Sequence, residues 1–406
     1  MAILFFAIGV LSFLYSYVGW KLLVPLGLGQ PWKVMVWIIL FIIAMLPLLS
    51  ILLRFNRIET VANDVIAWLG YISLGFVSLL FFFLLLKDAL WVASMAVAKI
   101  ASFFQGEAAQ HNTILSASGE ERRQLLWSTL NMAILGVSGV MTCIGYIQAK
   151  HRMKTIRVTI PIKDLPEDLE GLRIVQISDI HVGPTIKRKF TEEVVQRVNL
   201  LNPDIVALTG DLVDGSVEHL ADDVEPLKNL SAKYGKFFVT GNHEYYSGVY
   251  SWIEKVKELD FEVLLNQHKV LKPNQSELVM GGITDISARQ MVPSHQSDPV
   301  ASLAGAPPNT VKILLAHQPI SAYQAAKAGY DIQLSGHTHG GQYFPFSRLV
   351  KWQQPFLAGL YKHENTWVYV NRGTGYWGPP MRLGPPAEIT EVILSGRITD
   401  PIEETV

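Results

Sequence analysis

Aspartate, asparagine and histidine side chains recur in five short turns of the second half of the chain. These turns read DIH at 179–181, GDLVD at 210–214, GNHE at 241–244, AH at 316–317 and GHTH at 336–339. Five of the eleven histidines lie in these turns, which random scatter does not explain. Carboxylate, amide oxygen and imidazole groups are ligands of divalent first-row metals such as Mn, Fe, Zn, Co or Ni. The turns therefore indicate a metal site.

The number of candidate ligands indicates two metal ions. One tetrahedral zinc ion takes four ligands, whereas the turns offer seven, namely Asp179, His181, Asp211, Asn242, His317, His337 and His339. Two ions that share one carboxylate would use all of them, and such pairs serve phosphoester hydrolysis by a metal-bound hydroxide. The single cysteine, Cys143, argues against a structural zinc site of the cysteine type.

Each turn follows a short apolar run that predicts a buried strand. The runs cover 172–178, 204–209, 236–240, 312–316 and 331–335. Helices are expected over 191–200, with Thr191 as the N-cap, and over 218–230. Alternating strands and helices indicate an α/β sheet, in which ligands bind at the carboxyl ends of the strands.

The first 150 residues contain stretches that are apolar enough to cross a bilayer. Half of the chain is hydrophobic, more than is usual in a soluble enzyme. Spans of about 20 residues are predicted over 2–20, 34–53, 65–86 and 127–147. The stretch 88–104 is either a further span, in a five-span arrangement, or an interfacial helix, in a four-span arrangement.

We therefore expect an integral multi-pass membrane protein, in the cell membrane if the source is bacterial, with the lipid bilayer as a partner. The expected parts are transmembrane helices in 1–104 (three or four spans), a polar connector in 105–126, a last span in 127–149, an α/β domain in 155–397 and a tail in 398–406.

Two signals disagree on the side of the membrane that holds the α/β domain. Arg122 and Arg123 precede the last span, as in a twin-arginine export signal. The basic residues that follow the span favour the cytoplasmic side, and they are Lys150, Arg152, Lys154 and Arg157. We lean slightly toward the exported side.

The negative charge of the α/β domain disfavours nucleic-acid substrates. From residue 155 to the end, 23 Lys and Arg stand against 29 Asp and Glu, a net charge of −6. An acidic domain is a poor partner for a nucleic-acid backbone, so we disfavour a nuclease. The domain also offers few basic features for a phosphoprotein, and we infer no protein partner.

The five turns, taken in this order, resemble the calcineurin-like metallophosphoesterases. The resemblance implies a four-layer α/β/β/α sandwich with two mixed sheets. We assign the five strands above to one sheet, and we expect the later runs 367–371 and 388–395 in the second.

The resemblance also implies a role for each site residue. Asp179, His181 and His339 would bind the first metal ion. Asn242, His317 and His337 would bind the second, and Asp211 would bridge the two. His243 would stabilise or protonate the leaving oxygen. Asp214 would fix the tautomer of His243, or it is a helix N-cap or turn residue.

The segment GHTHGGQ, together with NRGTGYWGPPMRLGPPAEIT at 371–390, resembles a membrane-attached branch of the family. That branch includes transmembrane proteins with a metallophosphoesterase domain and enzymes that hydrolyse UDP-2,3-diacylglucosamine. Aromatic residues near these segments either form a lip for an acyl chain or pack the insert onto the sandwich. They are Tyr343, Phe344, Phe346, Trp352, Phe356, Tyr361 and Trp377.

We expect a membrane-anchored dinuclear-metal phosphoesterase. Its substrate would be a phosphodiester or pyrophosphate in a phosphorylated small molecule or lipid, such as UDP-2,3-diacylglucosamine. The alternatives are a phosphoprotein phosphatase and a catalytically silent membrane scaffold or sensor.

Overall fold

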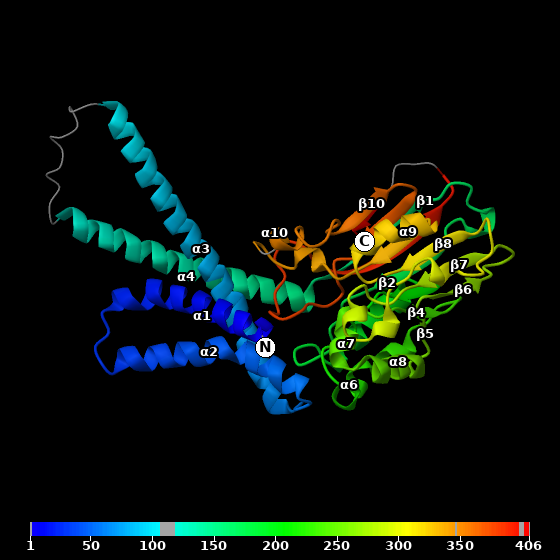
Figure 1. The fold of residues 1–406 in the computed structure, drawn as a ribbon, viewed down its shortest axis with the longest axis horizontal. Helices are drawn as coiled ribbons and strands as arrows, with labels where there is room; N and C mark the ends of the chain where they lie inside the picture. Colours follow the sequence, from blue (N-terminus) through cyan, green and yellow to red (C-terminus); the bar gives the residue numbers. More distant parts are fainter. Residues whose placement is uncertain (1, 106–117, 346, 398–401, 406) are drawn as a thin grey trace. The chain divides into compact units, whose positions relative to one another are not determined.

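The computed structural model describes residues 2–105, 118–345, 347–397 and 402–405. The chain forms two compact units. The first comprises Met1–Ile51 and Ile66–Ile144, and the second comprises Leu52–Val65 and Gly145–Val406. Helices make up the first unit, and the two sheets lie in the second (Figure 1).

Four helices run through the first unit: α1 (Ala2–Leu23), α2 (Trp32–Phe55), α3 (Val61–Gln105) and α4 (Ser118–His151). Each contains a stretch long and apolar enough to cross a bilayer. Because α3 is continuous, the stretches 65–86 and 88–104 belong to one helix. The helix α4 begins inside the expected connector, whose residues 106–117 lie outside the described part of the chain. Only the backbone is described at Arg122 and Arg123.

The helices of the first unit pack through apolar side chains that include Tyr15, Ala44 and Leu80. One charged group in α3 is paired within this unit. Asp88 lies 2.6 Å from the Lys21 ammonium and accepts a hydrogen bond of 2.7 Å from the Tyr17 hydroxyl. These contacts reduce the cost of a carboxylate in an apolar helix, because charges inside a membrane protein are paired.

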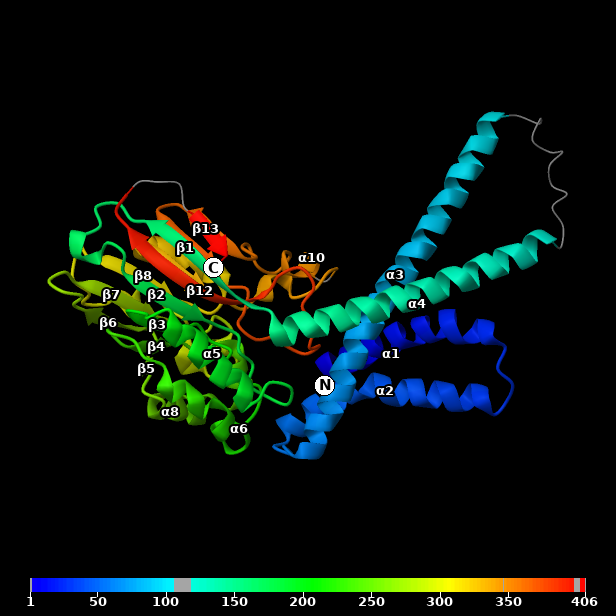
Figure 2. The same ribbon diagram turned by 180° about the vertical axis from the view of Figure 1, so that it is seen from behind.

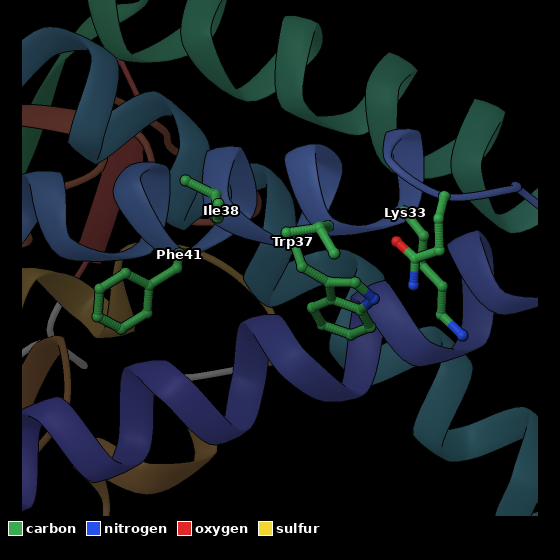
Figure 3. Close-up of a pocket in the computed structure, with 6 residues that line it drawn as sticks. Lys33, Trp37, Ile38 and Phe41 are labelled. Atoms are coloured by element: carbon green, nitrogen blue, oxygen red, sulfur yellow. The ribbon is translucent and has the colours of Figure 1, made fainter.

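A groove of about 380 Å³ lies beside α2 in the first unit. Figure 3 shows Lys33, Trp37, Ile38 and Phe41 along the wall that this helix provides. Gln30 and Val34 complete the lining, so the groove is apolar apart from its end at Gln30 and Lys33. A lysine at the end of an apolar helix face is typical of a membrane–water interface.

Two mixed sheets form the second unit. The seven-stranded sheet has the order β13–β1–β12–β2–β3–β4–β5. Its strands are β1 (Met153–Pro161), β2 (Arg173–Ile177), β3 (Ile205–Leu208), β4 (Lys236–Phe238), β5 (Glu262–Val263), β12 (Ala387–Ser395) and β13 (Ile402–Thr405). The strands β2 to β5 run parallel to one another.

The six-stranded sheet has the order β10–β11–β9–β8–β7–β6. Its strands are β6 (Gln267–Leu271), β7 (Leu278–Gly282), β8 (Val311–Leu315), β9 (Ile332–Ser335), β10 (Gly359–His363) and β11 (Thr366–Val370). The strands β7, β8, β9 and β11 are parallel, whereas β6 and β10 are antiparallel edge strands.

The helices of this unit are α5 (Arg188–Leu200), α6 (Val217–Val224), α7 (Asn242–Ser247), α8 (Val249–Glu258), α9 (Ala322–Ala328) and α10 (Ser347–Val350). Figure 2 shows α5, α6 and α8 on the outer face of the seven-stranded sheet. On the six-stranded sheet, Ala322 of α9 packs against Val368 and Val370. The layers therefore follow the expected α/β/β/α order.

Alternation along the strands divides the core between the layers, because successive side chains point to opposite faces. Ile174 and Ile205 pack with Ile313 of the other sheet. Their neighbours Val175 and Val206 pack on the helical side with residues of α5, α6 and α8. Continuous apolar runs are thus explained by burial on both faces.

The structure corrects several expectations. The five strands before the polar turns do not share one sheet, because β2, β3 and β4 lie in one sheet and β8 and β9 in the other. The two later runs are also divided, since 367–371 lies in β11 of the six-stranded sheet and 388–395 lies in β12 of the seven-stranded sheet. The helix expected over 218–230 ends at Val224, where a 3-10 helix follows. Thr191 is not an N-cap, since α5 begins earlier and the Thr191 hydroxyl donates to the Arg188 carbonyl inside the helix. The expected tail contains β13, which covers the edge of β1.

Trp252 supports the helical side of the seven-stranded sheet. Its side chain is fully buried, and its Nε1 donates to the Gly215 carbonyl at 2.9 Å. We expect Trp252→Ala to lower the free energy of unfolding by about 3–5 kcal/mol, because it leaves a cavity and an unpaired carbonyl. Denaturant unfolding of the full-length protein in detergent would measure this loss. Trp352→Ala is the matched control, since Trp352 is 84% exposed, and an equal loss would contradict the prediction.

Candidate metal centre

The seven predicted ligands lie directly after the carboxyl ends of five strands. Asp179 and His181 follow β2, Asp211 follows β3, Asn242 follows β4, His317 follows β8, and His337 and His339 follow β9. Six of these side chains belong to buried residues, and His337 is partly buried. Both sheets therefore contribute donors to one edge of the sandwich, which is the edge where ligands of α/β sheets bind.

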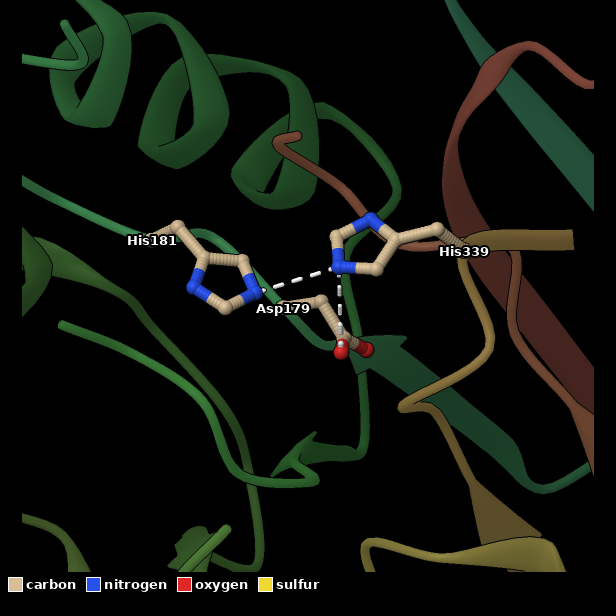
Figure 4. Close-up of side chains that lie close together, drawn as sticks. All are labelled: Asp179, His181 and His339. Carbon is tan, nitrogen blue, oxygen red and sulfur yellow. Dashed lines mark hydrogen bonds and ion pairs between the residues drawn. The ribbon is translucent and has the colours of Figure 1, made fainter. Parts of the chain in front are cut away.

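Asp179, His181 and His339 form the first group of donors. One donor atom from each lies within 4.8 Å of the others. Figure 4 shows both imidazole rings beside the Asp179 carboxylate. The Nε2 atom of His339 lies 3.6 Å from Asp179 Oδ1 and 3.1 Å from His181 Nε2. The His337 backbone N–H donates to both Asp179 oxygens, at 2.9 and 3.0 Å, and fixes the carboxylate.

Asp211, His317 and His337 form the second group, again within 4.8 Å. His317 Nε2 lies 3.1 Å from Asp211 Oδ2 and 3.1 Å from His337 Nδ1. The Nδ1 atom of His317 donates to the Thr209 carbonyl at 2.8 Å, so its Nε2 is turned to the group. Asp211 also forms a group with His181 and His243, and it therefore lies beside residues of both sets.

Asn242 begins the short helix α7, and its side chain is buried. Its Oδ1 atom has no hydrogen-bond partner among the described residues. An unpaired buried oxygen is costly, and such groups call for a specific explanation. A bound cation would provide one.

Five of the seven residues have a left-handed backbone, with φ of 53° at Asp179, 53° at His181, 51° at Asp211, 70° at His337 and 51° at His339. Non-glycine residues seldom adopt this conformation, which costs about 1–2 kcal/mol per residue. Strain of this kind gathers at functional sites. The backbone therefore marks the same residues as the donor chemistry does.

Two glycines leave room for the carboxylates. A Cβ atom at Gly241 would lie 2.2 Å from Asp211 Oδ1, and one at Gly336 would lie 2.2 Å from Asp179 Oδ2. Both contacts are far inside van der Waals distance. The glycines that precede Asn242 and His337 thus let two turns approach the carboxylates of a neighbouring turn.

The surroundings of His337 and His339 lower the pKa of both imidazoles. Burial and the nearby His317 lower the pKa of His337 to about 3. Burial and His181 also hold the pKa of His339 well below its ordinary value. Both imidazoles are therefore neutral at pH 7, as metal ligands must be.

The carboxylates attract positive charge into the centre. Burial alone would raise the pKa of Asp211, but His317 and His243 outweigh it and hold the pKa well below the usual range. Burial likewise opposes the charged form of His317, whereas Asp211 raises its pKa well above the ordinary value. A centre that stabilises a buried proton in this way fits a cation that would replace it.

His243 and Asp214 form a pair beside these groups. His243 Nδ1 lies 2.5 Å from Asp214 Oδ1, and the His243 backbone N–H donates to Asp211 Oδ1 at 2.9 Å. Burial lowers the pKa of His243, but Asp211 and Asp214 raise it to about 9. The N-cap of α6 is Ser216, so Asp214 does not cap that helix.

Sequence reasoning gave no role to two residues that fix the turns. The buried Glu244 accepts hydrogen bonds from the backbone N–H groups of Asp211, Leu212 and Gly241. The buried Arg382 donates to the carbonyls of His339, Gly373 and Gly375. Glu244 ends the GNHE turn and Arg382 lies in the stretch 371–390, but their spacing alone does not reveal these backbone contacts.

The aromatic residues near the centre divide into two sets. The rings of Tyr246 and Trp377 lie 5.3 and 5.5 Å from the His243 ring, and both side chains are about half exposed. Phe356 instead packs against Tyr361, at 5.0 Å. Among the proposed lip residues, Trp377 therefore flanks the centre, while Phe346 lies outside the described residues.

Comparisons with known proteins show the family of this chain. Residues 172–341 match the family model for calcineurin-like phosphoesterases. A transmembrane protein with metallophosphoesterase domain from Danio rerio is 42% identical over 286 residues, which cover 68% of this chain and 64% of that protein. The protein of the same name from Bos taurus is 40% identical over 64% of this chain and 61% of its own length.

These two matches span slightly less than two thirds of the relatives' own length. An uncharacterised metallophosphoesterase from Aquifex aeolicus is 31% identical over 249 residues, which cover 60% of this chain and 93% of that protein. The five polar turns all lie within the residues matched by the family model. The chain therefore belongs to the calcineurin-like metallophosphoesterase family.

Proposed function

We propose that this protein is a membrane-anchored, metal-dependent phosphoesterase that hydrolyses a phosphodiester or pyrophosphate bond. The convergence of seven donor residues from five strand ends carries this proposal. The four apolar helices provide the anchor. Membership of the calcineurin-like metallophosphoesterase family supports the reaction class. The positions of the donors support the roles proposed below for the metal ligands, His243 and Asp214.

In this proposal the centre would hold two divalent ions. Asp179, His181 and His339 would provide donors for one ion, Asn242, His317 and His337 would provide donors for the other, and Asp211 would contribute to both. The neutral imidazoles, ionised Asp211 and unpaired Asn242 oxygen fit this role. When bound, such ions activate water and stabilise charge on the phosphoryl oxygens. The donors suit Mn, Fe, Zn, Co or Ni.

His243 acts on the leaving group. Its Nδ1 is held by Asp214 at 2.5 Å, which leaves Nε2 as the atom that carries a transferable proton. Burial opposes the charged form of the ring, whereas Asp211 and Asp214 raise the pKa of His243 to about 9, so these carboxylates favour the protonated imidazole. As the bond from phosphorus to the leaving oxygen breaks, His243 Nε2 gives that oxygen its proton. Asp214 keeps the ring oriented and stabilises its charged form.

The substrate we favour is lipid-linked, with UDP-2,3-diacylglucosamine as a candidate. The exposed rings of Tyr246 and Trp377 flank His243, so apolar surface lies next to the position of the leaving group. Aromatic side chains offer large apolar area and suit acyl chains or a membrane interface. The net charge of −6 beyond residue 155 continues to disfavour nucleic acid.

Removal of metal should abolish hydrolysis. We expect the purified full-length protein to cleave bis-p-nitrophenyl phosphate with Mn²⁺, to lose that activity in EDTA and to regain it when Mn²⁺ returns. Asp211→Asn should lower kcat/KM at least about 100-fold, because it removes several kcal/mol of charge stabilisation. Equal rates with and without chelator would overturn the metal-dependent mechanism. A folded protein without activity with any of the five metals would favour the silent scaffold.

Loss of His243 should depend on the leaving group. We expect His243→Asn to lower kcat about 10²–10⁴-fold for an alkyl phosphodiester, whose leaving oxygen needs a proton. The loss should be much smaller for a p-nitrophenyl ester, since p-nitrophenolate leaves without one. Asp214→Asn should show the same preference more weakly. A loss that is the same for both leaving groups would argue against proton donation.

Replacement of the flanking rings should affect lipids most. We expect Tyr246→Ser combined with Trp377→Ser to lower kcat/KM for UDP-2,3-diacylglucosamine about tenfold or more, which corresponds to the loss of one buried apolar contact. The rate with bis-p-nitrophenyl phosphate should change much less. Trp352→Ser combined with Phe356→Ser is the control, because Phe356 packs against Tyr361 and Trp352 is exposed, whereas Tyr246 and Trp377 flank His243. Equal losses on both substrates would exclude a lipid-binding role for Tyr246 and Trp377.

A further inference from the structure

The segment 52–65, which joins α2 to α3, belongs to the same compact unit as the two sheets. All four of its charged side chains contact the α/β domain. Asp64 lies 3.0 Å from the Lys187 ammonium. The other three are Arg54, Arg57 and Glu59, and their partners lie in two turns, at 214–216 and 247–248. One turn carries Asp214, and the other ends the helix that carries His243.

The first turn is held from two directions. Arg54 Nη1 donates to the Asp214 carbonyl at 2.8 Å. The Glu59 carboxylate accepts from the Ser216 backbone N–H, at 3.0 and 3.1 Å, and from the Ser216 hydroxyl. A Cβ atom at Gly215 would lie 2.8 Å from Glu59 Oε1, so the carboxylate is seated directly against this turn. Charged hydrogen bonds of this kind are about twice as strong as neutral ones.

The second turn is held by Arg57. Its Nη1 atom donates to the Ser247 carbonyl at 3.1 Å. A Cβ atom at Gly248 would lie 2.8 Å from Arg57 Nη2, and Gly248 has a left-handed backbone with φ of 104°. Ser247 is the last residue of α7, which begins at Asn242 and contains His243. The guanidinium therefore fixes the end of the helix opposite to the metal centre.

The two turns also bond to each other. The Gly215 backbone N–H donates to the Ser247 hydroxyl oxygen at 3.2 Å. The segment 52–65 thus bridges two turns whose spacing decides whether Asp214 reaches His243. That contact is short, at 2.5 Å, and a displacement of about 1 Å at such a site can cost about 100-fold in rate.

We propose that the segment 52–65 is a clamp that positions Asp214 against His243, with Arg54, Arg57 and Glu59 as its positioning residues. The catalytic part of this inference rests on the leaving-group role proposed for His243.

The clamp also bears on the number of membrane-spanning helices. A segment that bonds to the α/β domain lies on the same side of the bilayer, so an even number of crossings separates residue 65 from residue 145. The helices α3 and α4 supply two crossings, which favours four spans over five.

The kinetic test compares two leaving groups. We expect Glu59→Ala to lower kcat about tenfold more for an alkyl phosphodiester than for bis-p-nitrophenyl phosphate. The substitution should weaken the contact of Asp214 with the proton donor His243 without displacing the metal ligands. Glu59→Gln keeps an acceptor oxygen, so it should retain most of the kcat that Glu59→Ala loses on the alkyl phosphodiester. Glu225→Gln is the matched control, since that carboxylate pairs with Lys255 on the surface. Equal losses on both substrates, or none, would overturn the positioning role.

A second test does not depend on activity. Glu59→Cys and Ser216→Cys are combined in a Cys143→Ser background, and native membranes are treated with a short bismaleimide. We expect an intrachain cross-link between positions 59 and 216, identified by mass spectrometry of the joined peptides. Absence of the cross-link, while each single cysteine is labelled, would overturn the clamp and the four-span inference. A cross-linked protein whose unsubstituted form hydrolyses no phosphodiester would instead reject the proposed function alone.

Discussion

The turns after β2, β3 and β9 hold five non-glycine residues in a left-handed backbone, and the rest of the α/β domain keeps them there. This conformation costs about 1–2 kcal/mol at each residue, so the surrounding contacts must offset it. Glu244 binds the backbone of the Asp211 turn, and the Asp179 carboxylate binds the His337 backbone. The apolar core between the sheets prevents either turn from relaxing. A rigid sandwich is therefore a requirement of the centre.

The sequence was sufficient to locate the polar turns, because each follows its strand directly in the chain. The apolar runs also predicted β2, β3, β4, β8 and β9 to within about two residues. It was not sufficient to assign these strands to sheets. Strand pairing depends on contacts between residues distant in the chain, and β8 and β9 proved to lie in the second sheet. The local pattern also misplaced the start of α5, since Thr191 bonds inside the helix.

The groups that support the centre were harder to predict than its donors. Metal-ligating residue types are recognisable from chemistry alone, whereas Glu244 and Arg382 act on backbone atoms that every residue carries. The aromatic residues illustrate the same limit. Position in the chain suggested that seven rings lie near the centre, but only the fold distinguishes Trp377, beside His243, from Phe356, which packs on Tyr361. The bonds of Glu59 to Ser216 link positions more than 150 residues apart, beyond any local pattern.

The contact of His317 with Asp211, at 3.1 Å, joins residues that follow strands of different sheets. Neither sheet alone contains a full set of donors, since Asp179, His181, Asp211 and Asn242 follow strands of the seven-stranded sheet and the other three follow strands of the six-stranded sheet. The first four also precede the other three in the chain. On the ribosome, the nascent chain cannot complete the centre until His339 has been added. In the proposed metal centre, ion binding by the full set of donors would therefore come late in synthesis, after the strands of both sheets are available. Because the last donor follows these strands in the chain, the proposed metal centre would be completed only when both sheets can pack together.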